Sequence, residues 1–221
     1  RMSATRKARN AGQVCTSPTR FFVDQSLYQP FTAAFVARAS QVVTGNGMMA
    51  GVEMGPVANH RRIEAMEALV EDAVAKGAKL LTGGQRPKGP GYFYPVTVLA
   101  EVPDDARIMR EEPFGPLAVI NPTASLDQAI AMANALPFGL AGYAFTHRAA
   151  TVDRLMAELE VGNLSINTLE ASVPEVPFGG VKHSGQGREG GQEGMNHYME
   201  VKTVSHRMEL ESDPTVSGAR P

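Results

Sequence analysis

The 221-residue chain is predicted to form an α/β domain with layered αβα architecture and a largely parallel sheet. Two observations predict this class. Short apolar runs alternate with longer amphipathic stretches along most of the sequence, as expected where strands alternate with helices. Hydrophobic residues make up 43% of the chain, which is enough to bury a sizeable core.

The elements expected in the first half follow from apolar spacing and from helix-ending residues. Asn59 is a suitable N-cap for the clearest helical stripe, and Gly77 is suited to end it. In chain order, we expect a helix over 1–9, a strand over 21–23, helices over 28–43 and 59–76, and a strand over 79–81.

The second half is predicted to continue the alternation. We expect Pro95 to place a strand over 92–99 at an edge of the sheet, because proline cannot donate to a ladder. The remaining expected elements are a buried strand over 117–120, a helix over 126–136, a strand over 142–145, a helix over 152–159 and a strand over 163–167.

Bulk composition excludes several classes of function. The formal net charge is −2 without a basic block, unlike a nucleic-acid binder. No apolar run approaches the ~18 residues that span a bilayer, so no membrane partner is expected. One cysteine among 221 residues favours a reducing, cytoplasmic setting. The five histidines are scattered, so we expect no metal site.

Cys15 is the strongest candidate for chemistry. Gly12 and Gln13 precede it and Thr16-Ser17-Pro18 follows it, whereas a packing cysteine usually stands in an apolar run. Such a small, polar loop leaves the sulfur reachable. The local sequence alone leaves a catalytic thiol and a buried structural thiol equally open.

A second candidate segment is the proline-bounded loop 111–116, which carries Glu111, Glu112 and Phe114 just before a predicted buried strand. One interpretation is a solvated acidic turn. The other is a ligand contact at the carboxyl end of the sheet, where α/β folds place their sites. A carboxylate at that position can accept hydrogen bonds from ribose hydroxyls.

Glycine dominates a third segment, 177–191, which holds six glycines. A flexible linker would lack the interleaved Phe178, Lys182 and Arg188, so we expect an ordered loop packed against a site. It lacks the spacing of a phosphate-binding loop. Asn167 ends the preceding strand, where it either lines a pocket or closes a strand-end turn.

Together these segments resemble the C-terminal, catalytic half of the NAD(P)-dependent aldehyde dehydrogenases. The matching motifs stand in the same order from about residue 6 to 204, nearly the whole chain. They are the Asn-Ala-Gly-Gln-Val-Cys run at 10–15, Glu-Pro-Phe-Gly-Pro at 112–116, Gly162-Asn163 through Asn167, Pro-Phe-Gly-Gly-Val-Lys at 177–182, Gly-Arg-Glu at 187–189, and Tyr-Met-Glu-Val-Lys at 198–202.

The resemblance implies a covalent mechanism. The Cys15 thiolate attacks the aldehyde carbon, hydride leaves to NAD or NADP, and the resulting thioester is hydrolysed to an acid. It also implies that Glu112 and Phe114 contact the nicotinamide ribose and that Phe178 lines the substrate funnel. The family's dinucleotide-binding domain, general-base glutamate and oxyanion asparagine belong to a half that has no counterpart here. We therefore expect the chain alone to be incompetent.

Substrate choice is suggested by the semialdehyde branch of the same family, which acts on succinic semialdehyde. Ser172 falls where those relatives place a serine that helps hold the distal carboxylate, and the run 17–20, with Arg20, is also similar. The resemblance therefore implies an ω-carboxylated aldehyde, with Ser172, Arg20, Asn167 and Phe178 as candidate substrate contacts. Both Ser172 and Arg20 also have purely structural interpretations.

The resemblance further implies a catalytic domain over 1–199, incomplete at its N-terminal edge, and an oligomerisation-type edge strand over 200–208. The polar, proline- and glycine-containing composition of 209–221 predicts a disordered tail. Relatives form homo-oligomers through that strand. Two alternatives stay open. One is a CoA-acylating relative that shares the acyl-enzyme at Cys15. The other is a truncated, non-catalytic partner of a separate nucleotide-binding subunit.

Overall fold

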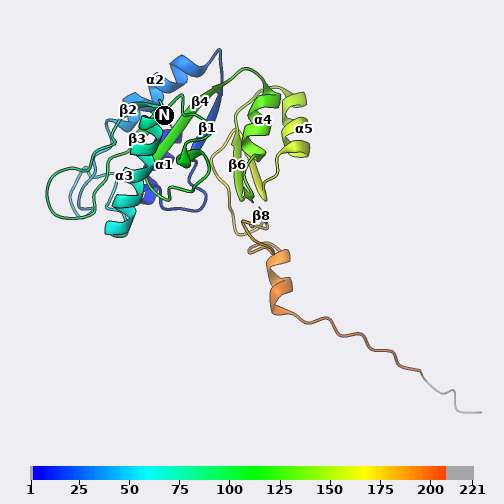
Figure 1. Cartoon of the computed structure of the whole chain (residues 1–221). Helices are drawn as coiled ribbons and strands as arrows, with labels where there is room; N and C mark the ends of the chain where they lie inside the picture. The colour runs from blue at the N-terminus through cyan, green and yellow to red at the C-terminus, as the bar shows by residue number, and fades with distance from the viewer. Residues whose placement is uncertain (1, 208–221) are drawn as a thin grey trace, which may run out of the picture.

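A four-stranded sheet forms the centre of the structure, a computed structural model that describes residues 2–207 (Figure 1). Its order is β1-β4-β3-β2. β1 (Arg20–Asp24) and β3 (Thr97–Ala100) each pair in parallel with β4 (Leu117–Thr123), and β2 (Lys79–Thr82) pairs antiparallel with β3. The prediction of an α/β fold with a largely parallel sheet is confirmed.

The core lies around β4, because this strand is paired on both sides. Leu117, Ala118, Val119 and Ile120 have no exposed surface, and Val98 and Leu99 of β3 are equally buried. Three helices contribute buried residues to the same core: α1 (Met2–Ala8), α2 (Tyr28–Ala39) and α3 (His60–Ala75). The short 3-10 turn η2 (Arg107–Met109) contacts α3.

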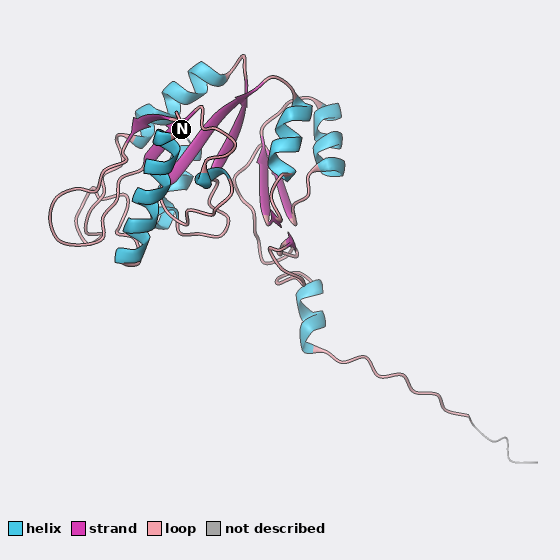
Figure 2. Cartoon of the chain, viewed as in Figure 1, coloured by secondary structure: helices cyan, strands magenta, loops and turns pink. Residues whose placement is uncertain are grey.

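A second group of elements stands beside the first (Figure 2). β6 (Ala141–Ala144) and β7 (Asn163–Ile166) pair in parallel, α4 (Leu126–Asn134) packs on α5 (Ala149–Glu158), and β5 (Phe138–Gly139) pairs antiparallel with β8 (Val181–Lys182). Helix α4 also contacts β1 and β4, so it connects this group to the central sheet.

The expected helix-end signals are confirmed for α3. The Asn59 side chain accepts a hydrogen bond from the Arg62 N–H at 3.2 Å, satisfying one of the free donors of the first turn. Gly77 ends the helix with a φ of +104°, a conformation that glycine adopts without steric cost. Ser125 caps α4 in the same way as Asn59, through the Gln128 N–H.

Several element boundaries differ from the predictions, and one assignment was wrong. The strand expected over 92–99 begins only at Thr97 and lies inside the sheet, between β4 and β2, not at its edge. Pro95 precedes the ladder, so it costs no hydrogen bond there. Helix α5 begins at Ala149, three residues before the apolar stripe that predicted it, and α2 ends at Ala39.

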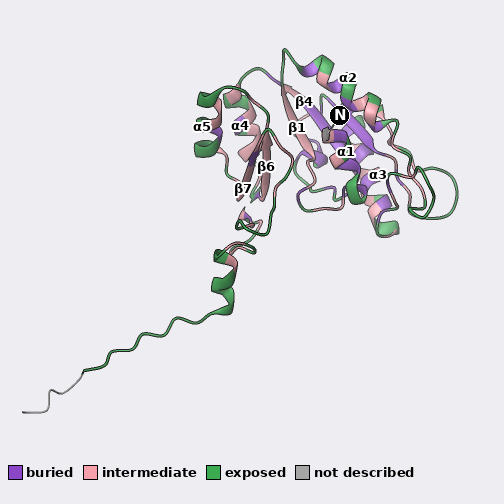
Figure 3. Ribbon diagram, turned by 180° about the vertical axis from the view of Figure 1, so that it is seen from behind, coloured by how far each residue is buried: buried purple, intermediate pink, exposed green. Residues whose placement is uncertain are grey.

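The last described segment leads away from the rest of the chain (Figures 1 and 3). After the 3-10 turn η3 (Glu193–Tyr198), residues 201–207 have no regular secondary structure and are exposed. Within residues 200–207 the expected edge strand has no partner strand among the described residues, and its role in oligomers stays a prediction. Residue 208 and the tail over 209–221 lie outside the described residues.

Candidate active site

Cys15 lies exposed in a tight turn that follows helix α1 and the 3-10 turn η1 (Arg9–Gly12). Asn10, Ala11 and Gly12 have φ values of 51°, 52° and 70°, so the chain reverses in a left-handed conformation that costs non-glycine residues energy. The Ser17 N–H then donates to the Val14 carbonyl at 2.8 Å and closes the turn around Cys15. We call residues 14–17 the nucleophile turn.

Polar residues before the nucleophile turn hold the backbone that leads into it. Asn10 and Gln13 bond reciprocally: Asn10 Nδ2 donates to the Gln13 carbonyl at 2.9 Å, and Gln13 Nε2 donates to the Asn10 carbonyl at 3.2 Å. Gln13 Oε1 also accepts from the Ala58 N–H at 2.9 Å. The Cys15 N–H itself makes no hydrogen bond within residues 2–207, so it is available to an oxyanion beside the sulfur.

The segment that carries Glu112 and Phe114 lies directly against this region. A Cβ placed on Gly12 would stand 2.2 Å from the Gly115 carbonyl oxygen and 2.9 Å from the Pro116 nitrogen. Only a glycine leaves room for so close a backbone approach. The structure thus brings together two of the predicted motifs, 10–15 and 112–116, which are about a hundred residues apart in sequence.

Glu112 and Phe114 are both exposed, and Phe114 adopts a φ of 40°. Within the described chain the Glu112 carboxylate has no hydrogen bond or ion pair, so it is free to accept from ligand hydroxyls. Between them, the buried Pro113 has its carbonyl bonded by Arg62 Nη1 at 3.2 Å. Helix α3 therefore holds the backbone of this loop through Arg62, while the side chains of Glu112 and Phe114 stay exposed.

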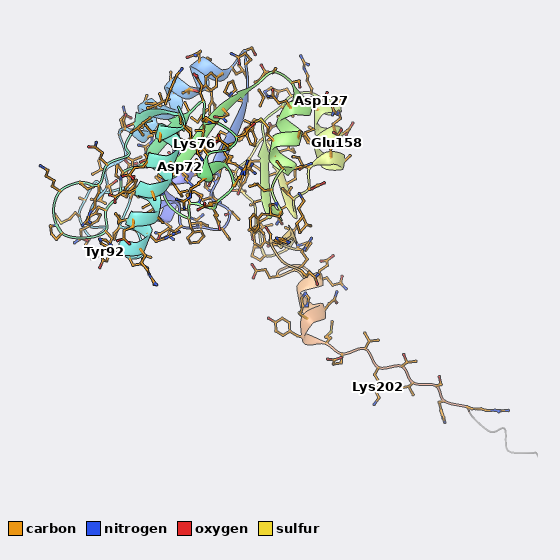
Figure 4. All side chains as sticks on the ribbon, in the orientation of Figure 1. Asp72, Lys76, Tyr92, Asp127, Glu158 and Lys202 are labelled. Atoms are coloured by element: carbon orange, nitrogen blue, oxygen red, sulfur yellow. The ribbon has the colours of Figure 1, made fainter. Side chains whose placement is uncertain are left out.

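Helix α3 also anchors the segment that leads into the loop. The Asp72 carboxylate accepts from the Arg107 N–H at 2.8 Å and pairs with Lys76 at 3.1 Å (Figure 4). Lys76 in turn donates to the Asp105 carbonyl at 2.8 Å. The backbone hydrogen bond from Arg107 keeps the pKa of Asp72 below its usual value. These contacts fix the path of the chain toward Glu112.

Tyr143 of β6 connects the second group of elements to the nucleophile turn. Its hydroxyl donates to the Thr16 carbonyl at 2.8 Å. Burial raises the pKa of the Tyr143 phenol, and the nearby charge of a Cys15 thiolate adds to the rise. Tyr143 was not predicted from sequence, because nothing in a short apolar strand indicates that one tyrosine contacts a distant turn.

Two predicted substrate residues are engaged in structural contacts. Asn167, with a φ of 58°, accepts from the Thr146 N–H at 2.9 Å and donates to the Thr146 carbonyl at 2.8 Å, which closes the strand end. Arg20 donates to the Met132 and Ala133 carbonyls at the end of α4, at 3.0 and 3.3 Å. Substrate contacts by either residue stay predictions.

Ser172 and Phe178 line one surface pocket together with Glu189. Phe178 and Glu189 exchange backbone hydrogen bonds at 2.7 and 2.8 Å, which shape one wall of the pocket. Within residues 2–207 no hydrogen bond or ring contact joins the pocket to Cys15. The structure therefore brings two predicted substrate residues together in one pocket.

The glycine-rich segment 177–191 is folded rather than a flexible linker, as the sequence predicted. Asn163 Nδ2 donates to the Gly179 carbonyl at 2.8 Å, and Arg188 Nη1 donates to the Gly180 carbonyl at 2.9 Å. A Cβ on Gly162 would lie 1.8 Å from the Gly179 oxygen, so this loop packs directly on the start of β7.

Two cations that precede the nucleophile turn in sequence, Lys7 and Arg9, were not predicted as site residues. Lys7 of α1 has no exposed surface, and its Nζ lies 3.3 Å from Ser17 Oγ and 3.2 Å from Thr19 Oγ1. Burial lowers the pKa of Lys7 to about 7, although the negative charge of Glu112 acts to raise it. Arg9 is exposed, six residues before Cys15, and has no hydrogen bond or ion pair in the part of the chain that the structure describes.

Among residues 2–207, no cluster of three or more histidine, cysteine or acidic side chains is placed to hold a metal ion. Over the same range, every helix is too short or too polar to cross a bilayer.

The sequence matches the aldehyde dehydrogenase family over residues 2–204. It is 51% identical over 200 residues to 4-(hydroxymethyl)benzenesulfonate dehydrogenase from Comamonas testosteroni, a match that covers 90% of this chain and 41% of that protein. It is 41% identical over 198 residues to 3-sulfolactaldehyde dehydrogenase from Pseudomonas putida, covering 90% and 41% of the two chains.

Solved structures show the same relationship. Succinate-semialdehyde dehydrogenase from Burkholderia pseudomallei superposes with a TM-score of 0.86 at 38% identity, covering 89% of this chain and 41% of that one. Betaine aldehyde dehydrogenase from Staphylococcus aureus, solved in complex with NAD+ and with a modified cysteine, superposes with a TM-score of 0.84 at 34% identity, over 89% and 40% of the two chains. This chain thus spans about two fifths of the length of its relatives, and it belongs to the aldehyde dehydrogenase family.

Proposed function

We propose that this chain is the catalytic half of an NAD(P)-dependent aldehyde dehydrogenase, with Cys15 as the nucleophile. One observation carries the proposal: an exposed thiol directly follows a strained segment, residues 10–12, whose backbone at Gly12 contacts the loop of Glu112 and Phe114. Strain of this kind persists where the surrounding structure holds it, as at active sites.

In the proposed reaction, the Cys15 thiolate attacks the aldehyde carbon and forms a carbon–sulfur bond. The oxyanion of the resulting thiohemiacetal is stabilised by the free Cys15 N–H. Collapse of this adduct expels hydride and leaves a thioester, which water cleaves to the carboxylic acid and the free thiol. Removing one oxyanion donor typically costs about 10²–10³ in rate.

The residues present are suited to one end of a nicotinamide cofactor. The unpaired Glu112 carboxylate can accept from ribose hydroxyls, and the exposed Phe114 ring offers an apolar contact beside it. When bound, NAD or NADP supplies the hydride acceptor. What this chain contributes is a loop, held by Arg62 and Asp72, that presents the exposed Glu112 side chain.

The substrate class that we propose is an aldehyde with a distal anionic group, a carboxylate or a sulfonate. Three relatives are named for a benzenesulfonate, for sulfolactaldehyde and for succinate semialdehyde, and each of these compounds carries such a group. Arg9, exposed and unpaired among the described residues, is a suitable cation for it, with Ser172, Phe178, Arg20 and Asn167 as the further contacts predicted from sequence.

A comparison of two matched substrates tests this class. In the full-length protein that carries this chain, 4-formylbenzenesulfonate should have a higher kcat/KM than benzaldehyde. Arg9→Met should lower the value for the sulfonate about 10- to 100-fold, the range expected for a charged hydrogen bond, and spare benzaldehyde. The control is Arg154→Met on α5, where Arg154 pairs with Glu158. Equal kcat/KM values of the unsubstituted protein for the two aldehydes would contradict this substrate class.

The oxidoreductase assignment has its own test. Cys15→Ser should abolish formation of reduced cofactor from every aldehyde, since a serine hydroxyl is a far weaker nucleophile at neutral pH. The 221-residue chain alone should form none, because most of the proposed cofactor site lies outside it. Turnover by the chain alone at an ordinary enzymatic rate would contradict this assignment.

Two features of the proposal concern the setting of the protein. We propose that the protein forms a homo-oligomer in which residues 200–208 add a strand to a second copy, and that it works in the cytoplasm, where a single thiol stays reduced. A CoA-acylating relative is the second candidate reaction. Release of an acyl-CoA instead of an acid, when CoA is added to the assay, would favour it.

A further inference from the structure

Lys7 lies at a buried position where the charge of a lysine is energetically unfavourable. It has no exposed surface, and burying an ammonium group without a carboxylate partner is strongly unfavourable. Among the described residues its two hydrogen-bond partners are hydroxyls, Ser17 Oγ at 3.3 Å and Thr19 Oγ1 at 3.2 Å. An alanine or methionine at this position of α1 would avoid the free energy of burying a charge. What the lysine adds is therefore its hydrogen bonding, which holds these two hydroxyls in place.

Both hydroxyls belong to the segment that leaves the nucleophile turn. Ser17 donates its N–H to the Val14 carbonyl and thereby closes the turn around Cys15. Thr19 Oγ1 also lies 3.4 Å from the Ser17 carbonyl, and the Val119 N–H bonds the Thr19 carbonyl. Lys7 therefore fixes the turn at the end opposite to the one that Asn10 and Gln13 hold.

We propose that Lys7 is a positioning residue for the nucleophile. Its ammonium group holds Ser17 and Thr19 so that the Cys15 N–H and Sγ face one carbonyl group together. This inference rests on the proposed function of Cys15. Charge-assisted hydrogen bonds are roughly twice as strong as neutral ones, so the positioning is strongest while Lys7 carries its proton.

The pKa of Lys7 is set by its burial and by one charged side chain. Burial lowers its pKa to about 7, and Glu112, from the loop before β4, is the one charged side chain in the described chain that acts against this. Lys7 therefore loses its charge near neutral pH. Positioning of the turn should weaken over the same interval.

Two reactions of Cys15, the only cysteine of the chain, separate positioning from simple exposure. With p-nitrophenyl acetate, the thiolate attacks the ester carbonyl, a carbon–sulfur bond forms, and p-nitrophenolate leaves with the electron pair of the broken carbon–oxygen bond. This reaction passes through an oxyanion that needs the Cys15 N–H. Alkylation by iodoacetamide forms no oxyanion and depends only on a reachable thiolate.

The experiment measures both second-order rate constants at Cys15, in the full-length protein that carries this chain, from about pH 5.5 to 9, and their ratio cancels the titration of the thiol. Lys7→Met should lower acylation at about pH 6 at least tenfold, by loss of one oxyanion donor, and leave alkylation within about twofold. The wild-type ratio should fall as pH rises through about 7, whereas the Lys7→Met ratio should stay flat.

Two further variants complete the design. Thr19→Val with Ser17→Ala removes the acceptors, and combining it with Lys7→Met should add little, since both act through the same contacts. Lys79→Met, which breaks an exposed pair with Glu101 at the other edge of the sheet, should change neither reaction. A flat wild-type ratio, or an equal loss of both reactions in Lys7→Met, would overturn the role of Lys7. No acylation of wild-type Cys15 at any pH would instead contradict the proposed function.

Discussion

Gly12 lies so close to the carbonyl of Gly115 that a Cβ on Gly12 would stand 2.2 Å from the Gly115 oxygen. This one contact joins the turn that presents the thiol to the loop that presents Glu112. Because both partners are backbone atoms, the distance between the two loops cannot be adjusted by a change of side-chain rotamer. The geometry of the candidate site therefore depends on a residue without a side chain.

Gly12→Ala tests this contact. The added methyl group would have to displace the 115–116 backbone while the substituted residue kept a φ of +70°, so we expect a loss of at least about 2 kcal/mol in the free energy of unfolding. Urea denaturation measures it. Gly47→Ala is the matched control, because a Cβ there has no neighbour within 4 Å, and it should change stability by less than about 0.5 kcal/mol. Equal effects of the two changes would refute the close approach.

Arg62 is expected to set the position of the cofactor loop through its bond to the Pro113 carbonyl. In the full-length protein, Arg62→Met should raise the Kd of NAD(P) about 5- to 10-fold. Losing a hydrogen bond from a charged group costs about 1–3 kcal/mol, and only part of this cost weakens cofactor binding. Fluorescence titration of the cofactor measures it. Arg61→Met, on the same helix with no bond from Arg61 among the described residues, should bind normally.

Tyr143→Phe removes the one side-chain hydrogen bond that joins β6 to the nucleophile turn in the described chain. We expect a cost of about 1 kcal/mol, and faster amide exchange over residues 14–19 than in the wild type. Mass-resolved hydrogen exchange measures this. Unchanged exchange in the turn would show that the second group of elements does not restrain it.

Stability should depend on pH through Lys7. Its pKa is about 7 in the folded chain and 10.5 in the reference state, so between these values the unfolded chain binds more protons. Stability therefore rises with pH across this interval, by about 1.4 kcal/mol per pH unit at most. Lys7→Met lacks this dependence, so its stability relative to the wild type should fall between about pH 7 and 10. A pH-independent difference, measured by urea denaturation at each pH, would contradict the lowered pKa.

Much of this fold follows from local sequence patterns. The stripe of α3, its Asn59 cap and the continuous apolar run of β4 predicted their elements within a few residues. The edge position predicted from Pro95 was wrong, because proline is confined to edge strands only where it lies within the hydrogen-bonded part of a strand. Here β3 begins two residues after Pro95. The start of α5 carries no apolar periodicity, so the stripe alone placed it too late.

The candidate site was predictable only where residue type carries the chemistry. The small polar loop around Cys15 and the proline-bounded loop of Glu112 made both residues candidates but left structural interpretations open, and the structure shows that both residues are exposed. Lys7 and Tyr143 act through contacts with residues that local spacing does not bring near, and only the folded chain reveals those partners. The same limitation left Asn167 open between a pocket and a turn until its bonds to Thr146 were known.

The central claim is that an acyl group passes through the Cys15 sulfur. Rapid acid quenching of the full-length protein during turnover of an aldehyde and NAD(P), followed by mass analysis of its peptides, tests this directly. We predict a mass increase equal to the acyl group on the peptide that contains Cys15, absent when the cofactor is omitted. Turnover with that peptide unmodified, or undiminished turnover by Cys15→Ser, would contradict the claim.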